Sequence, residues 1–305
     1  MITNEWDVKL FKAIEQGEIE VVKECLKNGA NASAINRDGY TALSNSIPCG
    51  ILPFPNTQNL KDIQKNKSEI VKILVENGAD VNQKTKTNGS SPLSLSIYNH
   101  QFETAKCLID NGANVTISDD VCVTPLHWAC SISKDHKDNN KNLEQYELVK
   151  MLIEKGADVN AEYKDFKETP LFWAIKNPVS YIHNIAELLI ENGADVNYKS
   201  KHGFTPLMKA ATSLNIKAVE LLLKNGADIN AKDNNELTVL NHINKVLAVP
   251  YPNLEQQQII DFLIEKGAKL GTTRNAEKQN DLDYLGLDLP NSNNEKSQNI
   301  RKKRK

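Results

Sequence analysis

The chain has 305 residues, of which 40% are hydrophobic and 25% are charged, and its formal net charge is −2. This balance excludes a globally basic nucleic-acid-binding protein, because neutralising phosphates requires clustered Lys and Arg. It also excludes a membrane-spanning protein, since the sequence contains no run of about 18 apolar residues. The N-terminus shows no Sec-type signal peptide and the five cysteines have no framework spacing, so we expect a cytoplasmic protein with free thiols.

The first predicted element is a helix over residues 6–16. A second apolar stretch comes after it and ends at Gly29, the first of several glycines that close a repeating unit. In the shortest later units a helix-capping Thr or Ser precedes the closing glycine by a fixed number of residues. Counting the same number back from Gly29 leads to Val8, whose side chain cannot cap a helix. We therefore expect the first unit to cap the N-terminal end of the core, with Trp6 covering that end.

From residue 41 onwards two short strings alternate along the chain. One begins with Thr or Ser, in most copies followed by Pro, which is typical of a helix N-cap with proline at the first helical position. The other ends an apolar stretch with Gly-Ala and, in most copies, Asp or Asn, with the glycine in the place of a left-handed C-cap. The cap residues are Thr41, Ser91, Thr124, Thr169, Thr205 and Thr238, and the closing glycines are Gly29, Gly78, Gly112, Gly156, Gly193, Gly226 and Gly267.

Between a cap and the next closing glycine lie two apolar stretches with helical spacing. After Thr205, for example, Leu207 and Ala210 share one face of a first helix, and Val219 and Leu222 share one face of a second. Such a unit is too small to bury a core alone, so units of this kind stack end to end. The linked copies resemble the ankyrin repeat, which has a period of about 33 residues.

This resemblance implies an all-α solenoid of stacked helix-turn-helix units with short β-hairpin-like loops. We expect one ankyrin-repeat domain over residues 1–271, with about seven units, in which the first and last units act as caps. The remaining residues, 272–305, are polar and contain no further unit. We expect most of this C-terminal tail to be disordered.

The units differ in length between their two helices, whereas the hairpins from closing glycine to next cap are nearly uniform in length. The separation of cap and closing glycine is smallest in the units that begin at Ser91 and Thr205, and largest in the unit that begins at Thr41. We expect the extra residues to form exposed loops. They are either tolerated drift on a surface turn, or a binding edge extended by Phe54 and Tyr251. The insertions are 48–66, 131–145, 177–181 and 245–256.

No motif of an enzyme active site is present, and no carboxylate pair stands out as a catalytic dyad. The best metal candidate is Cys122, His127, Cys130 and His136, a spacing that zinc can accept. The resemblance favours another role, because it implies that His127 joins a hydrogen-bond network between hairpin and helix, with Cys130 at a small core position. We therefore expect no catalytic residue, cofactor or metal. Acids of the Gly-Ala-Asp turns, such as Asp228, are expected to bond local backbone.

The resemblance also implies that hairpin tips and first helices line a concave face that binds another protein. Trp128 and Trp173 occupy equivalent first-helix positions in adjacent units, so we expect them to stack, either as the floor of a binding site or as part of the core. Residues at the tips should pack little, and we expect their removal to leave folding almost unchanged. The expected partner contacts are Tyr40, Tyr98, Phe204 and Leu237, around Trp128 and Trp173.

We expect a non-catalytic, monomeric scaffold for an unidentified protein partner, without a small-molecule substrate, a nucleic acid or a membrane. The alternative is a host-directed effector or regulatory adaptor whose tail supplies a second signal, and delivery to a host cell stays open. Residues 281–290 alternate acids with Leu or Tyr, and three fates remain for them: a cap on the last unit, disorder, or a short linear motif. Basic residues 301–305 fit a nuclear import signal, a contact with nucleic acid or anionic lipid, or a solvated charge run.

Overall fold

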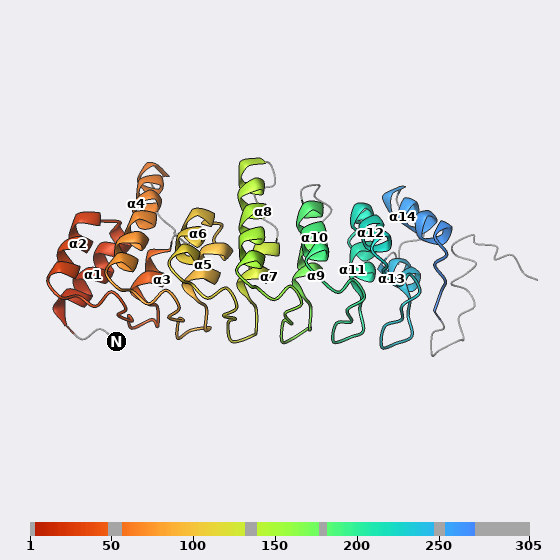
Figure 1. The fold of residues 1–305 in the computed structure, drawn as a ribbon, viewed down its shortest axis with the longest axis horizontal. Coiled ribbons are helices and arrows are strands. Elements are labelled where there is room, and N and C mark those ends of the chain that lie inside the picture. Colours follow the sequence, from red (N-terminus) through yellow and green to blue (C-terminus); the bar gives the residue numbers. More distant parts are fainter. Residues whose placement is uncertain (1–3, 48–56, 132–138, 177–181, 247–253, 272–305) are drawn as a thin grey trace, which may run out of the picture.

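The protein is a row of stacked helix pairs. The computed structural model describes residues 4–47, 57–131, 139–176, 182–246 and 254–271. Over these residues fourteen helices form seven units, each made of a first helix, a second helix and the hairpin leading to the next unit (Figure 1). The all-α solenoid expected from the sequence is confirmed.

Odd-numbered helices are the first helices of the units, and even-numbered helices are the second. First helices contact the first helices of neighbouring units, and from α2 to α12 second helices contact second helices, so the apolar faces of neighbouring units cover each other. In chain order the helices are α1 (Glu5–Gln16), α2 (Ile19–Lys27), α3 (Ala42–Ser46), α4 (Thr57–Glu76), α5 (Pro92–Tyr98), α6 (Phe102–Asp110), α7 (Pro125–Cys130), α8 (Asn139–Glu154), α9 (Pro170–Ile175), α10 (Ile182–Glu191), α11 (Pro206–Thr212), α12 (Ile216–Lys224), α13 (Val239–Val246) and α14 (Leu254–Glu265).

Most first helices begin with the expected side-chain cap, which satisfies a backbone donor that the helix itself leaves unpaired. Thr169 is an exception, because the backbone N–H of Phe172 donates to the carbonyl oxygen of Thr169 at 3.0 Å and its hydroxyl makes no cap bond. The cap bond is present at Thr41, Ser91, Thr124 and Thr205.

The closing glycines end the second helices in the left-handed conformation, as expected. Gly226 has a φ of 85°, its N–H donates to the carbonyl oxygen of Leu223 at 3.2 Å, and the next N–H, of Ala227, donates to that of Leu222 at 3.0 Å. This pair of bonds satisfies two unpaired helix-end carbonyls and turns the chain into the hairpin. An L side chain rarely adopts such a φ, which explains the repeated glycine.

Two sets of hydrogen bonds tie the hairpins of neighbouring units together. At the tips, backbone N–H groups donate to the preceding hairpin, for example from Lys164 to the carbonyl oxygen of Val121 at 3.1 Å. At the helix ends, the Asn side chain that follows Gly-Ala-Asp-Val or Gly-Ala-Asp-Ile reaches the next unit. Asn197 accepts from the N–H of Asp228 at 2.7 Å and donates to the carbonyl oxygen of Gly226 at 3.0 Å. The same amide clamp is made by Asn82, Asn160 and Asn230.

The unit closed by Gly112 lacks this clamp. It has Thr116 in place of Asn, and the Thr116 hydroxyl bonds Asn114 of its own hairpin at 2.8 Å. Among the described residues, no side chain of this hairpin donates a hydrogen bond to the carbonyl oxygen of Gly156, as the clamping Asn side chains do with the closing glycine of the next unit. The expected local role of the turn acids is confirmed, since Asp228 accepts from the N–H of Asn230 at 2.9 Å.

Three of the expected loops are wrong in part, because some of the inserted residues are helical. In the insertion 245–256, residues 245–246 belong to α13 and residues 254–256 to α14. The other two of these insertions lengthen second helices. α4 begins at Thr57 and α8 at Asn139, so 57–66 and 139–145 are helical, and both helices rise above their neighbours (Figure 1). Gln145 is buried, and its Nε2 donates to the carbonyl oxygens of Ala129 at 2.7 Å and Ser131 at 2.8 Å. Gln145 thereby provides hydrogen-bond donors for carbonyl groups at the C-terminal end of α7. Phe54, Tyr251 and the segments 48–56, 132–138, 177–181 and 247–253 lie outside the described residues.

The two ends of the row differ from the middle. Trp6 packs against the core at the N-terminal end. At the other end Asn241 stands where the preceding unit has buried Met208, and its Oδ1 accepts from the N–H of Gly271 at 2.7 Å. That these units are the caps of a domain over 1–271 stays a prediction, and the tail 272–305 lies outside the described residues.

Candidate functional site

Three aromatic side chains from consecutive first helices form a row. Tyr98 ends α5, Trp128 lies in α7 and Trp173 lies in α9. The ring centroids of Tyr98 and Trp128 are 4.8 Å apart and those of Trp128 and Trp173 are 5.4 Å apart, both pairs edge to face. Edge-to-face pairs are favourable by about 0.5–1.5 kcal/mol beyond the burial of their area. The expected stacking of the two tryptophans is confirmed.

The hairpin before α9 continues this row with two further aromatic residues. The Tyr163 ring lies 6.1 Å from that of Trp173, and the Phe166 ring lies 5.8 Å from that of Tyr163. Phe166 is anchored through its backbone, because its carbonyl oxygen accepts from the N–H of Lys201 at 2.9 Å. We call the five residues Tyr98, Trp128, Trp173, Tyr163 and Phe166 the aromatic strip.

The strip is accessible at both ends and partly buried in the middle. Tyr98 is 57% exposed and Phe166 is 49% exposed, whereas both tryptophans are half-buried and pack against the core. Large apolar side chains with such exposure are concentrated at only a few places on a soluble protein, and contiguous groups of them mark interaction sites. The arrangement is therefore suited to receiving an apolar surface of another molecule.

His127 packs against the aromatic strip and holds its neighbouring elements together. Its Nδ1 lies 2.8 Å from the Thr124 hydroxyl, its Nε2 lies 3.2 Å from the carbonyl oxygen of Glu168, and its ring stacks edge-on against Trp173 at 5.4 Å. Burial lowers the pKa of His127 to about 4, although the neighbouring carbonyl of Glu168 opposes the shift. The neutral imidazole thus joins the start of α7 to the hairpin before α9, as the resemblance implied.

A half-open hollow of about 540 Å³ lies at the hairpin end of the strip. Lys209 and Glu168 form an ion pair in its wall, with 3.1 Å between Nζ and Oε1. Lys176 follows α9 and is exposed at the hollow. The lining residues are Ser131, Tyr163, Phe166, Glu168, Trp173, Lys176 and Lys209.

The six contact residues expected from the sequence do not lie together. Tyr98, Trp128 and Trp173 are in the strip, whereas Tyr40, Phe204 and Leu237 belong to other hairpins. Tyr40 is 38% exposed. Phe204 and Leu237 are half-buried. The Phe204 ring lies edge-on to His242 at 4.7 Å, so its removal should also cost stability, in contrast to the expectation that tip residues pack little.

Sequence reasoning missed Tyr163 and Phe166. A weak signal was available, because their hairpin is one residue longer than the next, which runs from Gly193 to Thr205. The structure places the extra residue at the tip. The N–H of Tyr163 donates to the carbonyl oxygen of Glu168 at 3.0 Å, and this bond encloses one residue more than the equivalent bond from Ser200 to Phe204. The wider tip has room for Phe166, whose ring lies beside that of Tyr163.

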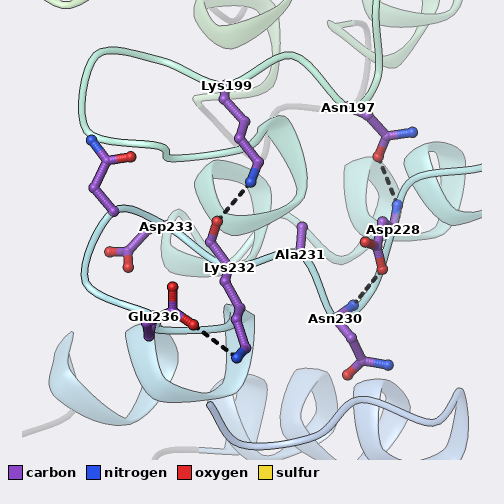
Figure 2. A pocket seen from close by; sticks show the side chains of 9 residues that line it. Asn197, Lys199, Asp228, Asn230, Ala231, Lys232, Asp233 and Glu236 are labelled. Atoms are coloured by element: carbon purple, nitrogen blue, oxygen red, sulfur yellow. Dashed lines mark hydrogen bonds and ion pairs between the residues drawn. The ribbon is translucent and has the colours of Figure 1, made fainter. Parts of the chain in front are cut away.

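A second hollow, of about 620 Å³, lies between the hairpins that precede α11 and α13 (Figure 2). Its polar groups already bond one another, as Figure 2 shows. Lys199 Nζ donates to the carbonyl oxygen of Lys232 at 2.9 Å, and Lys232 Nζ lies 2.9 Å from Glu236 Oε2. The polar groups of this hollow connect neighbouring hairpins, so few of them remain to bind a ligand.

The residues of the zinc candidate are placed differently from one another. Cys130 is buried in α7, where burial raises the pKa of its thiol, and Cys122 is exposed on the hairpin before that helix. His127 is engaged as described, and His136 lies outside the described residues. Within the described ranges, no group of three or more His, Cys, Asp or Glu side chains is arranged to hold a metal ion. None of the described helices combines the length and apolar character that crossing a bilayer requires.

Comparison with known proteins gives consistent matches. A family model of ankyrin repeats, three copies long, matches residues 62–160 and residues 139–233. The ankyrin repeat protein OPG189 of Variola virus is 31% identical over 152 residues, which cover 48% of this chain and 24% of that protein. Ankyrin repeat and SOCS box protein 6 of Homo sapiens is 30% identical over 159 residues, covering 51% and 32%. A putative ankyrin repeat protein of Borreliella burgdorferi is 32% identical over 167 residues, covering 50% and 67%. The match thus spans a third or less of the viral and human proteins.

Proposed function

Because the chain belongs to the ankyrin-repeat family, we propose that it is a non-catalytic scaffold that holds a partner protein against its first helices and hairpins. Ankyrin repeats generally mediate protein–protein interactions, and none of their units here carries a recognisable catalytic constellation. The partner, its site and a cytoplasmic, monomeric state are proposals that go beyond family membership.

The observation that carries the proposal is the aromatic strip. Five aromatic rings in contact, exposed at both ends, cross three consecutive units on the side of the first helices and hairpins. Rigid aromatic side chains are enriched among the few residues that dominate protein interfaces. We infer that Tyr98 and Phe166 insert into the partner, while Trp128 and Trp173 form the floor between them.

The remaining expected contacts extend this surface along the hairpins. Tyr40 lies on the first hairpin, and Phe204 and Leu237 lie on the hairpins before α11 and α13. In the proposal they are peripheral contacts, since no aromatic neighbour among the described residues connects them to the strip. Their replacement is expected to weaken binding less than replacement of Tyr98 or Phe166.

The experiment compares proteins captured by the full chain and by a Tyr98→Ala/Phe166→Ala variant, quantified by mass spectrometry. Both side chains are largely exposed, so the variant should fold, and its circular dichroism and melting temperature should match the parent. A partner of the strip should bind the variant at least roughly tenfold more weakly, which corresponds to about 1.4 kcal/mol. The matched control is Leu143→Ala, because Leu143 is 61% exposed but lies on the second helix α8. If no captured protein distinguishes the variant from the control, the strip is not the binding site.

The alternative, an effector or adaptor, depends on residues 281–290 and 301–305, which lie outside the described residues. Deleting 272–305 separates the two functions. A scaffold retains its partner and its location without the tail. An adaptor without the tail loses its location or a second partner. The Tyr98→Ala/Phe166→Ala variant, which keeps the tail, should retain both.

A further inference from the structure

The hollow at the end of the aromatic strip has an aromatic floor and a basic surround. Of the charged residues that line it, Lys176 and Lys209 are basic and Glu168 is acidic, although the whole chain has a formal net charge of −2. Glu168 is neutralised by Lys209 at 3.1 Å. The hollow is therefore suited to an extended segment that alternates acidic and apolar side chains.

The chain itself contains such a segment. Residues 281–290 read DLDYLGLDLP and contain three aspartates, four leucines, one tyrosine and no basic residue. Alternate side chains of an extended segment point to opposite sides. The side that carries Leu282 and Tyr284 can then cover Trp173 and Phe166. The aspartates beside them approach Lys176, because Lys209 is already paired with Glu168.

The described part of the chain ends beside the hairpins. After α14 it runs down toward the hairpins (Figure 1), and the N–H of Gly271 bonds the side chain of Asn241 in α13 at 2.7 Å. The backbone of Gly271 is close against the hairpin before α13, since a Cβ there would clash with the carbonyl oxygen of Glu236. A tail that starts here begins beside the hairpins.

The distance is within the reach of the linker. α13 contacts α11 and α11 contacts α9, so two steps of about 10 Å each separate Gly271 from the strip along the row. Residues 272–280 connect Gly271 to Asp281, and ten extended residue steps cover up to about 33 Å. A linker slightly longer than its span gives an effective concentration in the millimolar range.

We propose that residues 281–290 of the same chain occupy this hollow and cover the hairpin end of the aromatic strip. The inference rests on the proposed function, because it assigns an internal competitor to the surface that would receive the partner. A partner must then displace the segment. The last unit offers the segment a less suitable place, since Asn241 makes its outer side polar where Met208 is buried one unit earlier.

The test uses the full chain labelled with 5-fluorotryptophan and ¹⁹F NMR. The three tryptophans give three resonances, assigned by Trp→Phe variants. Trp173 reports on the hollow, and Trp6, at the opposite end of the row, is an internal reference. The variant Asp281→Asn/Asp283→Asn/Tyr284→Ser/Asp288→Asn should shift the Trp173 resonance and leave that of Trp6 unchanged. The control Glu277→Gln/Glu295→Gln removes acids outside the segment and should shift neither.

A synthetic peptide with the sequence DLDYLGLDLP supplies the second arm. Added at millimolar concentration to the segment variant, it should return the Trp173 resonance to its original position. The unaltered chain should require at least tenfold more peptide, because its own segment competes. Lys176→Glu in the segment variant should weaken peptide binding several-fold, and the matched control Lys224→Glu, an exposed lysine on α12, should not.

Three results would overturn the proposal. Identical Trp173 resonances in the unaltered chain and the segment variant would mean that the segment does not reach the hollow. A shift that disappears on dilution would assign the site to a second copy of the chain. Peptide binding unaffected by Lys176→Glu would place the segment elsewhere. None of these results changes the capture experiment with Tyr98→Ala/Phe166→Ala, so failure of this proposal and failure of the proposed function are separable.

Discussion

The first helices α7, α9 and α11 share a Thr-Pro-Leu start and diverge immediately after it. At the third position after the cap, His127 in α7 and Met208 in α11 are both fully buried, one polar and one apolar. At the fourth position Trp173 in α9 stacks on aromatic neighbours, whereas Lys209 in α11 forms an ion pair with Glu168. The shared string therefore sets where a helix begins, and the next two residues decide whether the unit buries a titratable side chain, presents an apolar surface or stays polar.

We expect the largest effect from His127→Met, which gives α7 the residue that α11 has at the same position and changes the pH dependence of stability. The pKa of His127 is lowered from 6.5 to about 4, so the unfolded chain binds a proton first as pH falls from about 6.5 to 4. Stability contributed by the neutral side chain is present above pH 6.5 and is lost through that window, by up to about 3 kcal/mol. Urea unfolding at pH 7 and pH 4.5 should show a smaller loss for the variant than for the parent. An equal loss in both would assign the pH dependence to other groups.

The next prediction compares Trp173 and Lys209, which stand at the fourth position after the cap in α9 and α11, by replacing each with Ala. Trp173→Ala removes contacts with Trp128, His127 and Tyr163 from a half-buried site and should destabilise the fold by about 2–3 kcal/mol. Lys209→Ala removes one partly exposed ion pair and should cost less than about 1 kcal/mol. Chemical denaturation of the two variants measures the difference. Similar losses would show that the strip contributes little to folding.

The smallest effect concerns the clamps between units. Asn197→Ala removes two bonds to the next unit and should cost about 1–2 kcal/mol. Thr116→Asn places the missing amide opposite Gly156 and should stabilise the protein by up to about 1 kcal/mol. Thermal unfolding of both variants is sufficient to measure the changes. Destabilisation by Thr116→Asn would mean that this hairpin cannot move its side chain toward the next unit.

Much of the fold could be predicted from the sequence because the informative residues act locally. A Thr-Pro start satisfies a backbone donor and sets φ, and a closing glycine supplies a left-handed turn, wherever the string occurs. The helical extension at 57–66 and 139–145 was missed because the insertions were assigned as loops from their length alone. Whether inserted residues continue a helix depends on partners such as the carbonyl oxygens of Ala129 and Ser131, to which Gln145 donates.

The candidate site was predicted less completely, for a related reason. Trp128 and Trp173 were found because equivalent positions in adjacent units must be neighbours. Tyr163 and Phe166 join them through the wider tip of their hairpin, and repeat spacing does not predict where an extra tip residue directs its side chain. The amide clamps were missed in the same way, since Asn197 bonds a residue 31 positions away along the chain.

The missing clamp at Thr116 has a mechanical consequence. A solenoid without contacts between distant units behaves as a spring, and tension along it is borne in series by every junction between neighbours. The junction after Thr116 has no amide clamp, but it keeps the tip bond from Lys164 to Val121, the packing of neighbouring helices and the contact between the Trp128 and Trp173 rings. We expect a pulled molecule to extend first at this junction. A partner bound across the strip would brace it, so force and binding would act on the same two aromatic rings.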